Sequence, residues 1–206
     1  MNPYRACALA VGLALPGLSH AHSSVAGMNS FYAGLLHPLL TLPHMLVLAG
    51  LGIWLGQHPP LRLKTPLLAF AAGCAAALLL TTRIAIPPSS QNVVMTVVMA
   101  VALGCGILVA ASARLPVGLR ATVAAVAAIA VALDSGVDSA PTVLATSFTL
   151  LGTWISTTVL LANVAYYTSL CPPRQWVQIA LRIAGSWMAA ASVLVLAFAL
   201  KGMPLA

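Results

Sequence analysis

The sequence predicts an all-α integral membrane protein, in which a cleavable signal peptide precedes a bundle of about six transmembrane helices. Three observations support this fold class: 61% of the residues are hydrophobic, only 5% are charged, and the hydrophobic residues fall into long stretches. A soluble domain carries roughly a quarter charged residues, which keep its surface in water. With two acids and nine bases in 206 residues, the chain lacks the polar surface of a soluble globule.

Residues 1–21 have the three parts of a signal peptide. Arg5 precedes a short apolar run, and Ser19 and Ala21 place small residues at the −3 and −1 positions of a cleavage site. Cleavage after Ala21 makes His22 the first residue of the mature chain, whereas a competing cut after Ser19 makes it the third. Either cut leaves a histidine at or near the mature terminus.

The remaining residues, 22–206, are expected to form one transmembrane domain with six apolar stretches. Each stretch has about the 17–25 residues that a helix needs to cross the ~30 Å hydrocarbon core, where only helices or closed barrels satisfy their backbone. Short connections rich in Pro, Gly and Ser separate them. The expected spans are Phe31–Gly56, Pro66–Ile86, Val93–Ser112, Val117–Leu133, Val143–Tyr167 and Val177–Leu200.

The basic residues predict which side of the membrane each connection faces. With the mature terminus outside, only Arg83 and Lys201 fall near the outer face. The other bases of the mature chain fall on the cytoplasmic side, as the positive-inside rule requires, which predicts a bacterial inner-membrane protein with a periplasmic N-terminus. All are isolated rather than clustered, so nucleic acid is not an expected partner. The cytoplasmic set is Arg62, Lys64, Arg114, Arg120, Arg174 and Arg182.

Small and polar residues within the spans are interpreted mainly as helix-packing positions. Three small-residue pairs predict faces where helices approach closely, namely Gly73 and Ala77, Gly104 and Gly106, and Ala124 and Ala128. A stripe on the fifth span either packs by bonding to its own helix or lines a pore: Thr146, Thr149, Thr153, Ser156, Thr157 and Asn163. The four cysteines have no metal-ligand spacing, so no chemistry is expected of them.

His37 and His44 are the strongest functional candidates, because an ionisable side chain inside a span is costly unless it has a function. In a continuous helix they share one face and lie roughly 10 Å apart. Pro38 and Pro43 lie between them, and each removes a backbone hydrogen bond and kinks the helix. Freed carbonyls beside an imidazole resemble the ion sites of transporters with broken helices. The alternative is a neutral histidine bonded to a neighbouring helix. His58, in the first cytoplasmic connection, is interpreted as a surface residue, with an exit ligand as the alternative.

The only two acids, Asp134 and Asp138, fall in the outward connection between the fourth and fifth spans. Imidazole and carboxylate together suit a divalent transition metal such as nickel, cobalt, zinc or copper. The alternative for the acids is a solvated loop or a salt bridge to Arg83 at the same membrane level. The predicted metal ligands are three histidines and two acids: His22, His37, His44, Asp134 and Asp138.

Residues 37–44 read HPLLTLPH, which resembles the HPxxGxDH signature of the HupE/UreJ family of hydrogenase and urease accessory membrane proteins. That family is regarded as nickel or cobalt permeases, and the signal peptide, six spans and chain length are similar too. The chain departs from the signature at Thr41, where the family has Gly, and at Pro43, where it has Asp. In the family's His-Gly-x-Glu stretch, Ser135 replaces the histidine and Asp138 the glutamate.

The resemblance implies a permease that moves nickel or cobalt from periplasm to cytoplasm, with no permanently bound cofactor. Lipid, the metal ion and metalloenzyme-maturation proteins are the implied partners. The alternative is an accessory subunit that binds or senses metal without moving it, which the loss of the signature acid at Pro43 favours. An enzyme is not expected. Ser186 is the nearest candidate for a serine nucleophile, and no histidine outside the N-terminal region and first span is placed to serve it.

Overall fold

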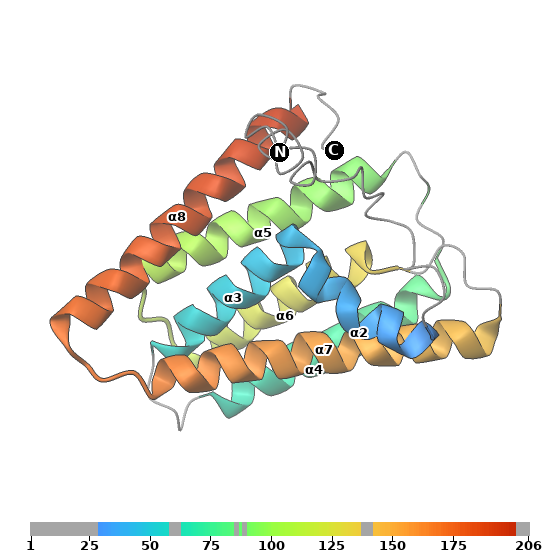
Figure 1. The fold of residues 1–206 in the computed structure, drawn as a ribbon, viewed down its shortest axis with the longest axis horizontal. Coiled ribbons are helices and arrows are strands. Elements are labelled where there is room, and N and C mark those ends of the chain that lie inside the picture. The colour runs from blue at the N-terminus through green and yellow to red at the C-terminus, as the bar shows by residue number, and fades with distance from the viewer. Residues whose placement is uncertain (1–28, 58–62, 85–86, 88–89, 137–141, 201–206) are drawn as a thin grey trace, which may run out of the picture.

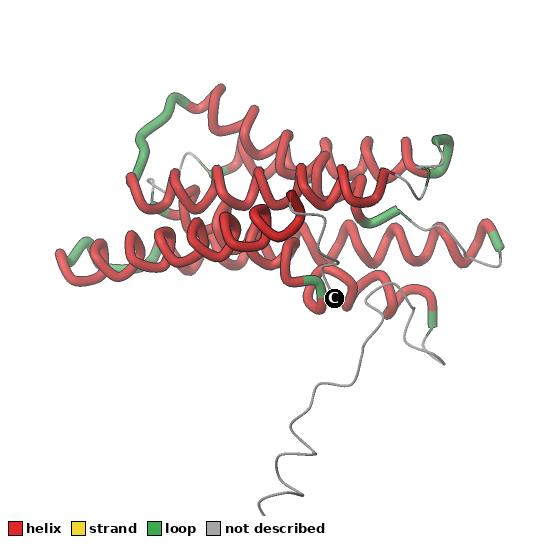
Figure 2. Tube along the Cα trace, turned by 90° about the horizontal axis from the view of Figure 1, so that it is seen from above, coloured by secondary structure: helices red, strands yellow, loops and turns green. Residues whose placement is uncertain are grey.

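The computed structural model of the chain describes residues 29–57, 63–84, 87, 90–136 and 142–200. Within these ranges the chain forms helices joined by loops, with no strand (Figure 2). The predicted signal peptide and its cleavage sites lie outside the described residues. The helices are α2 (Ser30–Leu40), α3 (Leu42–Gly56), α4 (Lys64–Thr81), α5 (Gln91–Ala111), α6 (Val117–Asp134), α7 (Val143–Ser169) and α8 (Gln175–Leu200).

Five helices, α4 to α8, are each long and apolar enough to cross a membrane. The pair α2 and α3 qualifies only when taken together, as one broken span or a re-entrant loop, which brings the number to six. Figure 1 shows α4 to α7 running back and forth along the long axis, with α2 and α3 together following the same course. The predicted class, a membrane bundle of about six helical spans, is confirmed.

The first span is not the continuous helix that the sequence predicted. It breaks at Thr41, and the axes of α2 and α3 differ by 71°. Thr41 itself is extended, with φ −96° and ψ 105°. Pro43 lies in the first turn of α3, where its missing N–H is one that no helix could pair. The predicted distortion by proline is therefore confirmed, but it amounts to a break rather than a kink.

Helix α3 lies at the centre of the bundle. It contacts α2, α5, α6, α7 and α8, and two-thirds of its length is buried. Trp54 fixes the C-terminal half of α3, because its indole Nε1 donates to the carbonyl oxygen of Ala113 at 2.9 Å. A central helix of this kind is shielded from lipid, so the polar side chains it carries face protein.

Close helix contacts involve several of the small residues singled out in the sequence. A Cβ atom on Gly73 would meet Ala128 at 3.5 Å, and one on Gly106 would meet the backbone of Ala189 at 2.7 Å. These contacts join α4 to α6 and α5 to α8. The prediction was wrong for Gly104, which has open space around it.

The helix bounds differ from the predicted spans by a few residues at most ends, and one difference matters for function. Asp134 was expected in a connection, but it is the last residue of α6. Arg120, expected among the cytoplasmic charges, lies one turn into the same helix and is buried. Both charged groups are therefore part of the bundle rather than of its loops.

Candidate metal site

The site lies where α2 gives way to α3, and its local structure begins with Pro38. Proline has no N–H, so the carbonyl of Gly34, one turn earlier, loses its helical partner. Thr153 on α7 supplies the missing donor: its hydroxyl donates to the Gly34 carbonyl oxygen at 3.2 Å. Thr153 belongs to the polar stripe of the fifth predicted span, and this contact favours the packing interpretation of that residue over a pore lining.

Helix α2 is also held against α7 by glycine. A Cβ atom on Gly34 would collide with the backbone carbonyl of Thr149, and one on Gly152 would collide with the carbonyl oxygen of Phe31. The two backbones therefore approach each other as closely as helices can, which needs glycine on both sides. This contact fixes the position of α2 and of the histidine it carries.

Thr41 ends α2 by satisfying the carbonyl of His37 twice. The Thr41 backbone N–H donates to the His37 carbonyl oxygen at 3.1 Å, and the Thr41 hydroxyl donates to the same oxygen at 2.8 Å. The last carbonyls of a helix need partners from outside it, and here one is supplied at the break. Thr41 stands where the family signature has Gly, and its hydroxyl serves as the cap.

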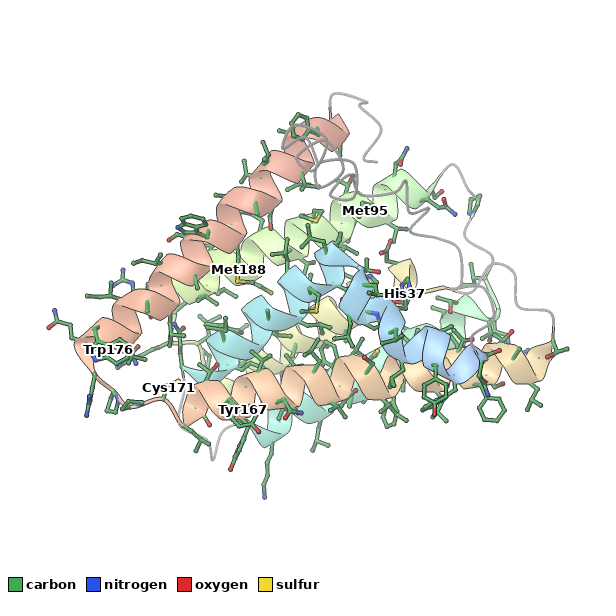
Figure 3. The ribbon with its side chains drawn as sticks, viewed as in Figure 1. His37, Met95, Tyr167, Cys171, Trp176 and Met188 are labelled. Carbon is green, nitrogen blue, oxygen red and sulfur yellow. The ribbon has the colours of Figure 1, made fainter. Side chains whose placement is uncertain are left out.

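The break brings the two candidate histidines together. The ring centroids of His37 and His44 are 5.2 Å apart with an interplanar angle of 66°. The sequence predicted roughly 10 Å along a straight helix, and that prediction was wrong because the chain turns at Thr41. Figure 3 labels His37 on α2, close to the start of α3. His37 is half-buried, whereas His44 is completely buried.

Asp134 reaches His44 from the end of α6. The Asp134 Oδ2 atom lies 2.8 Å from the His44 Nε2 atom, and only 17% of the carboxylate side chain is exposed. The separation is that of an ion pair, and the contact is not a hydrogen bond, because Nε2 has no hydrogen-bond partner among the described residues.

The two ring nitrogens of His44 differ in their contact with Asp134. Both are buried without a hydrogen-bond partner in the described part of the chain, but only Nε2 lies within ion-pair distance of the carboxylate. A buried polar atom without a partner is costly and needs an explanation, of which a bound ion is one. Because the carboxylate lies against Nε2, Nδ1 is the candidate electron-pair donor of His44.

The structure gathers three of the five predicted ligands: His37, His44 and Asp134. The other two, His22 and Asp138, lie outside the described residues. Asp134 pairs with His44, not with Arg83, which is exposed in the turn after α4. Within the described residues no group of three or more His, Cys, Asp and Glu side chains has the arrangement to hold one metal ion. The visible site therefore offers two imidazoles and a carboxylate that contacts one of them.

Ser186, the one candidate considered for a nucleophile, lies elsewhere. Its hydroxyl donates to the carbonyl oxygen of Arg182 on its own helix, in a shallow surface pocket between α5 and α8. The Arg182 Nε atom in turn donates to the carbonyl of Ala110 at 2.8 Å. The first of these hydrogen bonds lies within α8, and the second joins α8 to α5.

The fold and the site together define a multi-pass helical membrane protein with a buried imidazole–carboxylate pair at a broken span. The chain belongs to the HupE/UreJ family: residues 9–195 match the model described as HupE / UreJ protein. Nickel and cobalt transport is ascribed to that family, so the chain is a membrane protein of a metal-permease family. No curated protein and no solved structure matches the chain significantly.

Proposed function

We propose that the chain is a permease for a divalent transition-metal ion, nickel or cobalt, moving it from the periplasm to the cytoplasm. The observation that supports this most directly is the pair of imidazoles, 5.2 Å apart, at a break in a membrane span. Imidazole nitrogen binds nickel and cobalt well, and also zinc and copper. Family membership favours nickel and cobalt over the other two.

The two histidines differ in exposure in a way that suits a path. A metal ion from the outer end meets the half-buried His37 first and the fully buried His44 next. The predicted outer ligands His22 and Asp138 would capture it earlier. Few protein ligands mean modest affinity, and conduction needs binding weak enough for the ion to leave.

The proposed direction follows from the charges and from energetics. Lys64, Arg114 and Arg174 lie at or beside the helix ends that we assign to the cytoplasm, which supports a periplasmic N-terminus. The membrane potential favours inward movement of a cation by about 2.3 kcal/mol per elementary charge per 100 mV. A divalent ion therefore gains twice that amount without hydrolysis of a nucleotide.

The alternative function is a membrane subunit that binds or senses metal without transporting it. It is favoured by the lack of a three-ligand group in the described residues and by Pro43 at the position of the signature acid. Such a protein would need the histidines for binding, but no uptake would depend on them.

The test is metal uptake in a bacterial strain that lacks its own nickel and cobalt importers. Cell-associated metals are measured by mass spectrometry for wild type, His37→Ala, His44→Ala and the histidine control His58→Ala at matched expression. A permease predicts uptake of nickel or cobalt that both site variants lose and the control retains. Absence of uptake, with metal still bound by the purified protein, would support the alternative instead.

A further inference from the structure

We infer that Asp134 is the positioning residue for His44, that it takes the place of the signature acid missing at Pro43, and that His44 binds the metal through Nδ1. The inference rests on the proposed function and assigns a distinct role to each of the two residues. Asp134 is then not a metal ligand, in contrast to what the sequence predicted.

The first step concerns which nitrogen of His44 is available. A neutral imidazole has one protonated nitrogen and one with a free lone pair, and an ionised carboxylate can only accept. Asp134 Oδ2 lies 2.8 Å from Nε2, which favours the proton on Nε2 and leaves the lone pair on Nδ1. Both ring nitrogens are buried without a hydrogen-bond partner among the described residues, but only Nε2 lies within ion-pair distance of the carboxylate, so Nδ1 is the nitrogen left for a metal. The contact therefore favours the tautomer that binds a metal through Nδ1.

The second step concerns the placement of Asp134. A carboxylate at the C-terminal end of a helix is disfavoured by the helix dipole, which is negative there. Asp134 is the last residue of α6 and is mostly buried, so neither helix stability nor solvation explains it. Its contact with His44 on α3 does explain it.

The third step concerns the arrangement of a carboxylate against a metal-binding histidine. Histidines that bind metals commonly place their second ring nitrogen against a carboxylate, which orients the ring and makes it a stronger ligand. In this chain Pro43 precedes His44 and lies buried in the first turn of α3, so the neighbouring position supplies no carboxylate. The carboxylate comes across the helix interface from α6 instead.

The experiment is a Co²⁺ titration of the purified full-length chain in detergent, followed by the ligand-field absorption of the bound ion. The variants are Asp134→Asn, the double variant Pro43→Asp with Asp134→Asn, His37→Ala and His44→Ala. Losing a carboxylate that orients a metal-binding histidine weakens binding about 10–100-fold. Asp134→Asn is expected to raise the Co²⁺ Kd by that factor while the absorption bands keep their positions, because the ligands are unchanged.

The double variant moves the acid to the signature position. Aspartate suits the first turn of a helix, so the start of α3 is retained. We expect the double variant to bind Co²⁺ within about tenfold of wild type, because a carboxylate at position 43 would again orient the histidine. If Asp134→Asn does not yield folded protein, the double variant alone tests the inference. A folded double variant that binds Co²⁺ about 100-fold more weakly than wild type overturns it.

Two other results would also overturn it. An unchanged Kd in Asp134→Asn would mean that the carboxylate has no role in binding. A shift or loss of the absorption bands would make Asp134 a direct ligand. If His37→Ala and His44→Ala also leave the Kd unchanged, the proposed function itself fails, so the two failures are distinguishable.

Discussion

His37 and His44 are seven residues apart in sequence, yet their ring centroids lie 5.2 Å from each other across a 71° break in the first span. A straight helix would separate them by roughly 10 Å along its axis. Two imidazoles at this distance can cooperate on one ion or hand it from one to the other. The break is therefore as important to the site as the histidines themselves.

Rejoining α2 and α3 should abolish uptake without unfolding the bundle. The double variant Thr41→Leu with Pro43→Leu removes the capping hydroxyl and the proline, and leucine favours a continuous helix. The rings then move apart, so nickel or cobalt uptake is expected to fall to background. Pro66→Leu, which changes a buried proline in the first turn of α4, is the control and should transport normally. Normal uptake by the rejoined variant would show that the break is not needed.

The hydrogen bond from Thr153 to Gly34 should matter only while Pro38 is present. Thr153→Val should lower the free energy of unfolding by about 0.6–1.5 kcal/mol, as expected for a hydrogen bond between membrane helices. In a Pro38→Ala background the Gly34 carbonyl regains its own helical donor, so the same change should cost almost nothing. Denaturant unfolding in detergent measures this double-mutant cycle.

Thr146→Val is the control for that cycle. The Thr146 hydroxyl bonds only to the Thr142 carbonyl at the exposed start of the same helix, α7, so its loss should leave stability unchanged. Equal costs for Thr153→Val in both backgrounds would mean that the hydroxyl does not compensate for the proline.

Gly34→Ala should destabilise the protein, whereas Gly104→Ala should not. The added methyl on Gly34 meets the backbone of α7, which cannot move aside as a side chain can, so a loss of about 1–3 kcal/mol or more is expected. Gly104 has open space, and alanine there should be neutral or up to about 1 kcal/mol stabilising. Thermal unfolding in detergent compares the two. A stable Gly34→Ala protein would contradict the close contact of α2 with α7.

Cysteine labelling tests the orientation of the bundle. Cys171 is exposed in the loop between α7 and α8, which we assign to the cytoplasm, whereas Cys74 and Cys105 are buried. A membrane-impermeant maleimide should leave Cys171 unmodified in intact spheroplasts and modify it in inverted vesicles, as read by peptide mass spectrometry. The two buried thiols should react only after denaturation. Modification of Cys171 from outside would reverse the proposed direction.

Much of the architecture could be predicted because hydropathy is a property of consecutive residues. Runs of apolar side chains located the spans to within a few residues, and α6 ends one residue beyond its predicted limit, at Asp134. That single residue decided whether the carboxylate belongs to a loop or to the bundle. Helix ends depend on capping contacts, such as the backbone N–H of Ser135 that closes α6, and hydropathy does not report these contacts.

By itself, the sequence determined that this is a membrane bundle of about six spans and that His37 and His44 are its unusual polar groups, since composition and local pattern suffice for both. Only the tertiary structure decided that the two rings meet, because their distance depends on the backbone at Thr41 and on the packing of α2 against α7. It also decided that Asp134 contacts His44. Ninety residues of chain separate those two groups, and the packing of α3 against α6 brings them together.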